Sequence, residues 1–399
     1  MLANAADYFT PKRFEQIQQL THSMSTPLLV IDPVIFRNQL VELMELFPYG
    51  KIFYAVKANP QHELLCILRD LGGCFDIASR YELDRILALG VSADRISYGN
   101  TIKKKVDIAY AYSKGIRLFA TDSEEDVIKL AENAPGSKIF VRVLTEGSQT
   151  ADWPLSRKFG CQMDMAFDLC VMARELGLIP HGISFHVGSQ QRDIGAWDSA
   201  IAKVTWLFER LNVECGIQLK MINIGGGFPA NYLARTNSLE TYAREITRFL
   251  TEDFGDEFPE VILEPGRSLA AHAGVLISEV ILISRKDKNG LNRWVYTDIG
   301  KFGGFIETMD EAIKYPVIVQ GQRGNIFDGL GNHESEGVVI AGPTCDSADI
   351  LYEHHKYELP MDMVSGDRLF WFAAGAYTTT YSAVDFNGFP PLAVMCLPD

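Results

Sequence analysis

Eight short apolar runs that alternate with helical patterns dominate the first 270 residues. The runs are rich in β-branched and aromatic residues, and amphipathic stretches such as HELLCILRDLG fill most of the gaps. In order, the runs are KIFYAV, CFDIA, RISYG, RLFAT, KIFVRV, GISFHV, MINIG and VILE. Strands that alternate with helices form a parallel sheet, and eight strands close a (β/α) barrel, whereas an open doubly wound sheet usually stops at about five or six. We therefore predict an α/β fold in which residues 26–270 form a (β/α)8 TIM-type barrel.

The pattern changes after residue 270. Two apolar runs flank KDKNGLN, whose Asn289-Gly290 pair is a hairpin signal, and further strand-like runs follow without long helical patterns between them. We predict a mostly β domain over residues 271–399, with residues 1–25 packed on it. The glycine-rich segment 321–337 is predicted to be a long loop.

The charge balance bears on the class of partner. The chain carries 37 Lys and Arg residues against 51 Asp and Glu residues, a net charge of −14. An acidic protein repels phosphate backbones, so nucleic acid is not an expected partner. We interpret the lysine run 103–105 as a solvated surface patch.

Cysteine usage and hydropathy bear on location. Seven cysteines are scattered along the chain without a CxxC pair, which is typical of a reduced, intracellular protein. The first twenty residues lack the apolar core of a signal peptide. The most apolar stretch, GVLISEVILIS, contains Glu279 and is too short to span a bilayer. We therefore expect a cytoplasmic protein without a membrane partner.

Polar side chains stand at the carboxyl ends of the predicted barrel strands. In a (β/α) barrel these ends meet at one rim, which carries the chemistry. The residues at these ends are Lys57, Asp76, Asn100, Asp122, Arg142, His186, Gly225–Gly227, Glu264 and Arg267. The sequence therefore predicts one active-site rim.

The last two strand ends, together with Lys57, point to a cofactor. GGGFP and EPGR follow the seventh and eighth strands, where barrels often bind phosphate through close backbone N–H groups. A lysine in a barrel mouth is desolvated and is a candidate Schiff-base amine. A glycine-rich turn or a solvent-facing Lys57 would each be common alone, and His186 could be a core histidine. Together with Glu264, however, they match the needs of pyridoxal 5′-phosphate (PLP): an amine for the aldehyde, a phosphate cradle and an acid for the ring nitrogen.

Other chemistries lack their motifs. There is no HExxH sequence, and His354 and His355 are adjacent instead of at ligand spacing, so we expect no metal site. Walker A, GxGxxG and serine nucleophile-elbow motifs are also absent from the sequence.

FYAVKANP, FDIAS, FHVGSQ, GGGFP, EPGR, GPTCDSADIL, GAYT and FNGF occur in that order over about residues 50–390. Together they resemble the fold type III, alanine-racemase-like PLP decarboxylases, the ornithine/diaminopimelate/arginine decarboxylase family. The PTCDSxD form and KFGGFIETMDEAIKYP look most like bacterial ornithine/lysine decarboxylases.

The resemblance implies a role for each matching residue. Lys57 would bind the cofactor aldehyde, His186 would stack on the ring, and Glu264 would pair with the ring nitrogen. Asp76 and Arg142 would lie near the bond to Lys57. Cys345 would donate a proton to the substrate carbanion, with Asp346 beside it, although an isolated cysteine is often only a small buried hydrophobe. The residues expected to hold the phosphate are Ser189, Gly226, Gly227, Gly266, Arg267 and Tyr377. The family also implies a homodimer whose shared active sites each take the Cys345 segment from the partner chain.

The implied reaction is decarboxylation of a basic L-amino acid, of L-ornithine to putrescine, of L-lysine to cadaverine, or of both, in polyamine biosynthesis. An acidic residue should bind the distal ammonium. Asp349 is one candidate, and Asp310 or Glu311 of the cluster with Glu307 is another, while Phe386 is expected to lie against the substrate. Diaminopimelate, arginine or carboxynorspermidine remain alternative substrates. A non-catalytic polyamine-regulating homologue is an alternative of another class, although the presence of the implied catalytic residues favours an enzyme.

Overall fold

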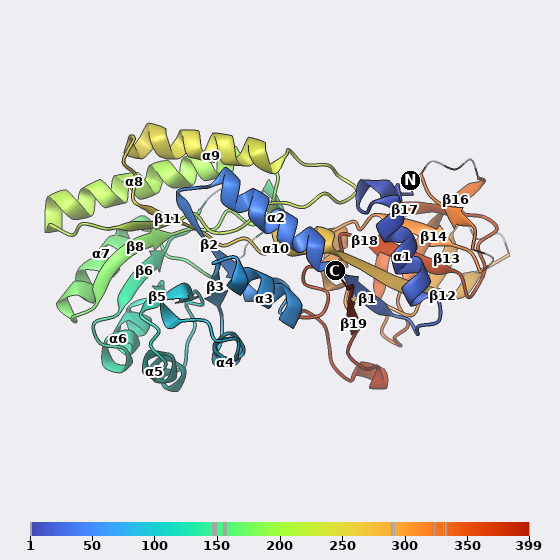
Figure 1. Cartoon of the computed structure of the whole chain (residues 1–399), viewed down its shortest axis with the longest axis horizontal. Helices are drawn as coiled ribbons and strands as arrows, with labels where there is room; N and C mark the ends of the chain where they lie inside the picture. Colours follow the sequence, from blue (N-terminus) through green and yellow to red (C-terminus); the bar gives the residue numbers. More distant parts are fainter. Residues whose placement is uncertain are drawn as a thin grey trace. The chain divides into compact units, whose positions relative to one another are not determined.

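The computed structural model describes residues 2–145, 150–154, 158–288, 290, 292–322, 324–329, 331 and 333–398. The chain divides into two compact units (Figure 1). The barrel unit comprises Arg37–Pro229 and Asn237–Ser268. The β unit comprises Met1–Phe36, Ala230–Thr236 and Leu269–Asp399.

A closed parallel barrel of eight strands forms the centre of the described barrel unit, in the order β10-β11-β2-β3-β4-β5-β6-β8. These strands are the eight runs that the sequence predicts, so the predicted (β/α)8 barrel is confirmed. Their bounds are β2 (Gly50–Ala55), β3 (Cys74–Ile77), β4 (Ile96–Tyr98), β5 (Leu118–Thr121), β6 (Lys138–Arg142), β8 (Ile179–Ser184), β10 (Met221–Asn223) and β11 (Glu260–Leu263).

Helices connect successive strands of the barrel (Figure 1). They are α3 (His62–Asp70), α4 (Arg80–Ala88), α5 (Lys105–Ser113), α6 (Glu124–Asn133), α7 (Met163–Glu175), α8 (Gly195–Cys215) and α9 (Leu239–Phe254), and α2 (Pro33–Leu46) precedes β2. Five buried side chains from β2, β5, β6, β10 and β11 pack together as one cluster: Phe53, Ala120, Phe140, Met221 and Ile262. Because β5 and β6 are not neighbours of the other three strands, this contact runs across the interior, which is therefore a packed core.

The lysine run 103–105 differs from the expected surface patch at its first residue. Lys103 is only 5% exposed. Its Nζ donates to Asp126 Oδ2 at 2.7 Å and to the carbonyl oxygens of Ala120 at 2.7 Å and Asn100 at 2.9 Å. A buried ammonium needs such a set of acceptors, because leaving it unpaired would cost several kcal/mol. Lys103 therefore ties the loop that follows β4 to strand β5 and helix α6.

The β unit contains a nine-stranded sheet in the described part of the chain. Seven strands follow the order β15-β14-β18-β12-β13-β16-β17, and β1 pairs with β12 and with β19. The bounds are β1 (Leu28–Ile31), β12 (Gly274–Arg285), β13 (Arg293–Thr297), β14 (Val317–Gln320), β15 (Ile326–Phe327), β16 (Ser335–Ala341), β17 (Ile350–Pro360), β18 (Arg368–Phe372) and β19 (Ala393–Cys396). The predicted mostly β domain is confirmed.

A predicted hairpin and a predicted long loop lie in this unit. β12 and β13 pair in antiparallel fashion, as a hairpin requires, although Asn289 lies outside the described residues. The segment 321–337 is not a loop throughout, because Ile326 and Phe327 form β15, which pairs with β14, and β16 begins at Ser335.

The division into units differs from the predicted boundaries near the N-terminus. Residues 26–36 fall in the β unit because β1 pairs antiparallel with β12, with Leu29 opposite Leu276. Helix α1 (Pro11–Thr21) contributes Phe14 and Ile17 to the core cluster that contains Phe370 and Phe372. The segment 230–236 also falls in the β unit.

Candidate active site

The candidate site is built from the carboxyl ends of the barrel strands. Lys57 lies in a 3-10 turn (Val56–Ala58) directly after β2, and Asp76 is the third residue of β3. Arg142 is the last residue of β6, His186 lies two residues after β8, and Glu264 directly follows β11. The closed parallel barrel therefore places all five at one rim.

The charged groups at this rim act on one another. Burial raises the pKa of Asp76 well above its usual range, the charge of Glu264 raises it further, and the Lys57 ammonium opposes both effects. The Ser97 hydroxyl donates to Asp76 Oδ1 at 3.1 Å. Burial also raises the pKa of Glu264, while a hydrogen bond from Asn223 and the charges of Arg142 and Lys57 lower it. Cations and carboxyl groups thus share one poorly solvated site, which is typical of functional sites.

The surroundings of His186 favour its neutral form. Burial, and then the positive charges of Arg142 and Lys57, lower its pKa well below the usual range. Its Nδ1 accepts a hydrogen bond from the Gly188 N–H at 3.0 Å, so the proton of the neutral ring is on Nε2. A neutral imidazole at this position can stack on an aromatic ring.

A group of anion-binding donors lies beside the glycine loop after β10. Arg267 is 3% exposed, and its Nε and Nη2 donate to Ser189 Oγ at 3.2 and 3.0 Å. Gly225 and Gly227 have φ values of +67° and +99°, which favour glycine. A Cβ atom at Gly226 would lie 2.4 Å from the Glu264 carbonyl oxygen, so only glycine fits this close approach. A buried guanidinium, a hydroxyl and a glycine loop suit a phosphate group.

The comparison with known families settles the family. The family model described as "pyridoxal-dependent decarboxylase, pyridoxal binding domain" matches residues 35–271. This chain belongs to the pyridoxal-dependent decarboxylase family. Ornithine decarboxylase from Saccharomyces cerevisiae is 33% identical over 379 residues, which cover 90% of this chain and 77% of that protein.

Solved structures of pyridoxal-dependent decarboxylases share the fold over nearly the whole chain. A lysine/ornithine decarboxylase from Vibrio vulnificus, complexed with cadaverine, has a TM-score of 0.84 and 28% sequence identity, covering 98% of this chain and 100% of that chain. The arginine decarboxylase of Paramecium bursaria Chlorella virus has a TM-score of 0.86 and 27% identity, covering 97% of this chain and 100% of that chain.

The residues at the rim fit PLP, the cofactor of pyridoxal-dependent decarboxylases. Lys57 offers an amine for the aldehyde, and Glu264 offers a carboxylate for the ring nitrogen. Arg267, Ser189 and the glycine loop offer the donor set for a dianionic phosphate. When bound, PLP supplies an electron sink for the electrons that a departing carboxylate leaves behind.

Two polar residues that the sequence analysis passed over also belong to this rim. Asn223 ends β10, and its Nδ2 donates to Glu264 Oε1 at 2.5 Å. Glu82 accepts a hydrogen bond from the Ala78 N–H at 2.6 Å; burial raises its pKa, and the Lys57 charge acts on it. Asn223 could have been found as the polar residue at a strand end. Glu82 could not have been found in this way. It stands three residues after Ser79, whose hydroxyl accepts the Glu82 N–H at 3.3 Å, and this spacing indicates only the start of a helix.

Apart from Gly266, which lies in the barrel unit, the other predicted site residues belong to the β unit. Cys345 is exposed, and its backbone N–H donates to Asn387 Oδ1 at 3.0 Å, which joins the Cys345 loop to the turn that carries Phe386. The N–H of Ala348 donates to Asp346 Oδ1 at 2.8 Å. Tyr377, expected at the phosphate, also lies in this unit, with a φ of +65°.

Asp349 is buried, and its carboxylate bonds within its own neighbourhood. Oδ1 accepts from the Lys301 N–H and Oδ2 accepts from the Thr344 hydroxyl, each at 2.7 Å. These bonds hold the start of the loop that continues into Cys345. We expected Asp349 as one candidate for binding the distal ammonium of the substrate. In the structure its carboxylate binds groups of the protein itself.

The Glu311 carboxylate also has partners within the protein, whereas Asp310 is exposed. The Glu311 carboxylate accepts the N–H groups of three successive β17 residues at 2.6, 2.7 and 2.8 Å. Although partial burial acts to raise its pKa, these three bonds together lower it. Asp310 is exposed and lines a surface depression of about 430 Å³, together with Lys301, Ser347 and His354.

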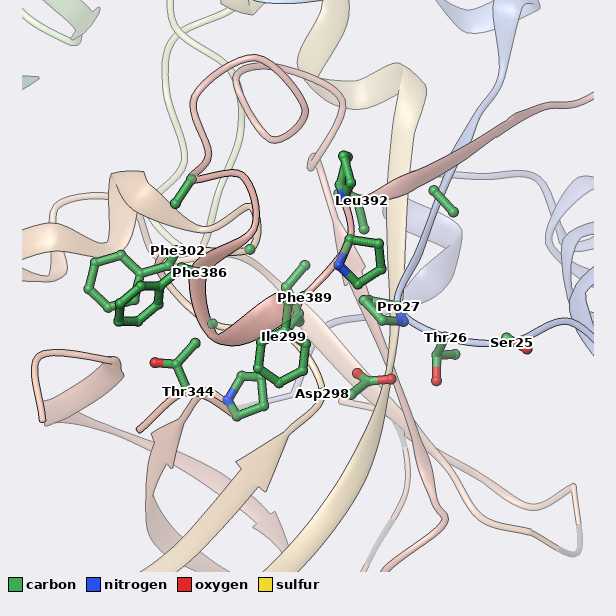
Figure 2. A pocket seen from close by; sticks show the side chains of 17 residues that line it. Ser25, Thr26, Pro27, Asp298, Ile299, Phe302, Thr344, Phe386, Phe389 and Leu392 are labelled. Carbon is green, nitrogen blue, oxygen red and sulfur yellow. The ribbon is translucent and has the colours of Figure 1, made fainter. Parts of the chain in front are cut away.

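Phe386 lines an apolar pocket of about 360 Å³ in the β unit (Figure 2). Its ring lies 5.3 Å from that of Phe302 between centroids. Thr344, directly before Cys345, lines the same pocket. The pocket therefore joins Phe386 to the Cys345 loop.

Among the described residues, no group of three or more His, Cys, Asp or Glu side chains is arranged to hold a metal ion. No described helix is long and apolar enough to cross a membrane.

Proposed function

We propose that this protein decarboxylates a basic L-amino acid, converting L-ornithine to putrescine, L-lysine to cadaverine, or both. The observation that carries the proposal is the gathering of Lys57, Glu264 and the Arg267–Ser189 pair at one barrel rim. Relatives that are named ornithine or lysine/ornithine decarboxylase support this choice of substrate. The reaction belongs to polyamine biosynthesis.

The barrel residues would divide the work as follows. Lys57 would hold the cofactor through its amine and would take part in binding the substrate amine and in releasing the product amine. Glu264 would pair with the ring nitrogen and keep it protonated, and His186 would pack on the ring. Asp76 and Arg142 orient groups near Lys57. The residues that would hold the phosphate are Ser189, Gly226, Gly227, Gly266, Arg267 and Tyr377.

Cys345 would deliver a proton to the substrate Cα after carbon dioxide leaves, with Asp346 beside it. Its exposed position in the β unit suits a group that acts on a partner's substrate. We propose a homodimer with two shared active sites, each completed by the Cys345 loop of the other chain. Asp349 then acts as a positioning residue for this loop, and Phe386 packs against the substrate.

Asp310 is our candidate for binding the distal ammonium, because the Glu311 carboxylate already accepts three backbone N–H groups. Asp310→Asn is expected to raise KM for ornithine and lysine by about 10-fold or more, with a smaller change in kcat, since a hydrogen bond to a charged group is lost. Glu311→Gln is expected to lower thermal stability instead. Steady-state kinetics with lysine and with norleucine, which lacks the distal ammonium, would check this. If only Glu311→Gln lost the discrimination between lysine and norleucine, Glu311 and not Asp310 would bind the distal ammonium.

One assay separates this function from its alternatives. Apo protein is mixed with PLP, its visible absorbance is recorded, and carbon dioxide release is measured with L-ornithine, L-lysine, L-arginine, meso-diaminopimelate and carboxynorspermidine. We expect PLP to bind, with turnover of ornithine or lysine. Turnover of arginine, diaminopimelate or carboxynorspermidine alone would overturn the substrate choice. A protein that binds PLP and turns over none of them would favour the non-catalytic, polyamine-regulating alternative.

We also propose that the enzyme is cytoplasmic. The support is the scattered distribution of its seven cysteines, without a CxxC pair.

A further inference from the structure

Asn223 is a buried amide that contacts two parts of the cofactor site at once. Its side chain is 1% exposed. Nδ2 donates to Glu264 Oε1 at 2.5 Å, and Oδ1 accepts the N–H of Gly225 at 2.9 Å. Glu264 would bind the cofactor ring, and Gly225 opens the loop that would bind its phosphate.

The orientation of this amide follows from its two partners. The Gly225 N–H can only donate, so it must face the amide oxygen, which leaves the NH2 group for the carboxylate. The backbone around it is paired with strands on both sides. Asn223 pairs with Ser184 of β8 and Ile262 of β11, and the Phe185 N–H donates to its carbonyl oxygen at 3.0 Å.

The glycine loop is tied to Glu264 a second time through the main chain. The Glu264 N–H donates to the Gly225 carbonyl oxygen at 2.9 Å. A Cβ atom at Gly225 would lie 2.3 Å from the Phe185 carbonyl oxygen, so only glycine fits where the loop passes the residue that follows β8. Asn223 therefore closes a ring of contacts in which Glu264 and Gly225 keep a fixed separation.

We infer that Asn223 is a positioning residue that aims the Glu264 carboxylate at the cofactor ring nitrogen while it anchors the phosphate loop. It favours the ionised carboxylate, because an amide N–H donates best to a charged oxygen. One buried side chain would thus position both the carboxylate for the ring nitrogen and the loop for the phosphate. This inference rests on the proposed PLP-dependent function.

Two substitutions should shift cofactor binding in opposite directions along the pH scale. Asn223→Leu keeps a side chain of similar size but removes both hydrogen bonds, so Glu264 should ionise only at higher pH. We expect PLP affinity to fall about 10-fold at neutral pH. The pH below which affinity is lost should rise by about one unit. Asn223→Asp places a second carboxyl beside Glu264, and two such groups share one proton. While that proton is held, the introduced carboxyl group can donate, so affinity should stay near wild type at lower pH and fall as pH rises.

The experiment is PLP titration of apo protein, followed by absorbance from pH 6 to pH 9, beside thermal melts of the apo forms. Asn133→Asp, which removes a bond to the Lys129 carbonyl oxygen on α6, is the matched control and should behave as wild type. Wild-type affinity and pH dependence in both Asn223 variants, or an equal loss at every pH, would overturn the inference. If Asn223→Leu does not fold, Asn223→Asp decides alone. A wild-type protein that binds no PLP would refute the proposed function instead.

Discussion

Lys57→Ala is expected to abolish decarboxylation, with kcat for ornithine or lysine reduced by at least ~10³-fold. The lysine lies in the turn after β2, at a rim where its charge acts on Asp76, Glu82, Glu264 and His186. Alanine removes the amine that would hold the cofactor and release the product. The visible absorbance of the PLP complex should change, and dialysis should remove PLP more readily. The two measurements are the rate of carbon dioxide release and the amount of PLP retained after dialysis.

A second variant separates the amine from its charge. Lys57→Arg keeps a positive charge near the carboxyl groups but cannot form a Schiff base. It should retain PLP better than Lys57→Ala and still be inactive. Lys105→Ala, which removes an exposed partner of Glu132, should keep full activity. Turnover near the wild-type value in Lys57→Ala would contradict the assignment of Lys57.

Mixing two inactive variants is expected to restore activity. Cys345→Ala should lower kcat by about 10²-fold or more, because a general acid is lost. Lys57 and Cys345 lie in different units of the chain. If each active site takes Lys57 from one protomer and Cys345 from the other, a random mixture of Lys57→Ala and Cys345→Ala chains contains heterodimers with one intact site. Such a mixture should recover about a quarter of wild-type activity.

The measurement is carbon dioxide release after the two variants are co-expressed, with sedimentation to verify the dimer. Cys66→Ala, at a half-buried cysteine in the barrel unit, is the control and should be active by itself. A mixture that stays as inactive as its parents, although heterodimers form, would mean that each site is built within one chain.

The barrel and its rim could be predicted because their signals are local. Each strand is a short apolar run, and each helix has its own periodicity. Once eight strands run parallel in a closed barrel, their carboxyl ends meet at one edge. Lys57, Asp76 and Glu264 could therefore be assigned to one site from their positions at the carboxyl ends of strands. The chemistry followed from the side-chain types needed by PLP.

Strand pairing and burial could not be predicted in the same way. The run that forms β1 is as apolar as a barrel strand, yet it pairs with β12, far along the chain. Lys103 is written in a run of lysines, but Asp126 and two carbonyl oxygens surround its ammonium. Both outcomes depend on groups that are distant in sequence.

The sequence alone determined the barrel, the cofactor class and the strand-end positions of Lys57, Asp76, Arg142, His186 and Glu264, because apolar periodicity and strand-end chemistry depend on neighbouring residues. Only the tertiary structure decided which polar groups remain available. The carboxylates of Glu311 and Asp349 accept backbone N–H groups, while Asp310 is exposed. Asn223 meets Glu264 only because β10 and β11 lie side by side. The physical reason is that a buried polar group must bond to whatever the fold places beside it, and sequence spacing does not carry that information.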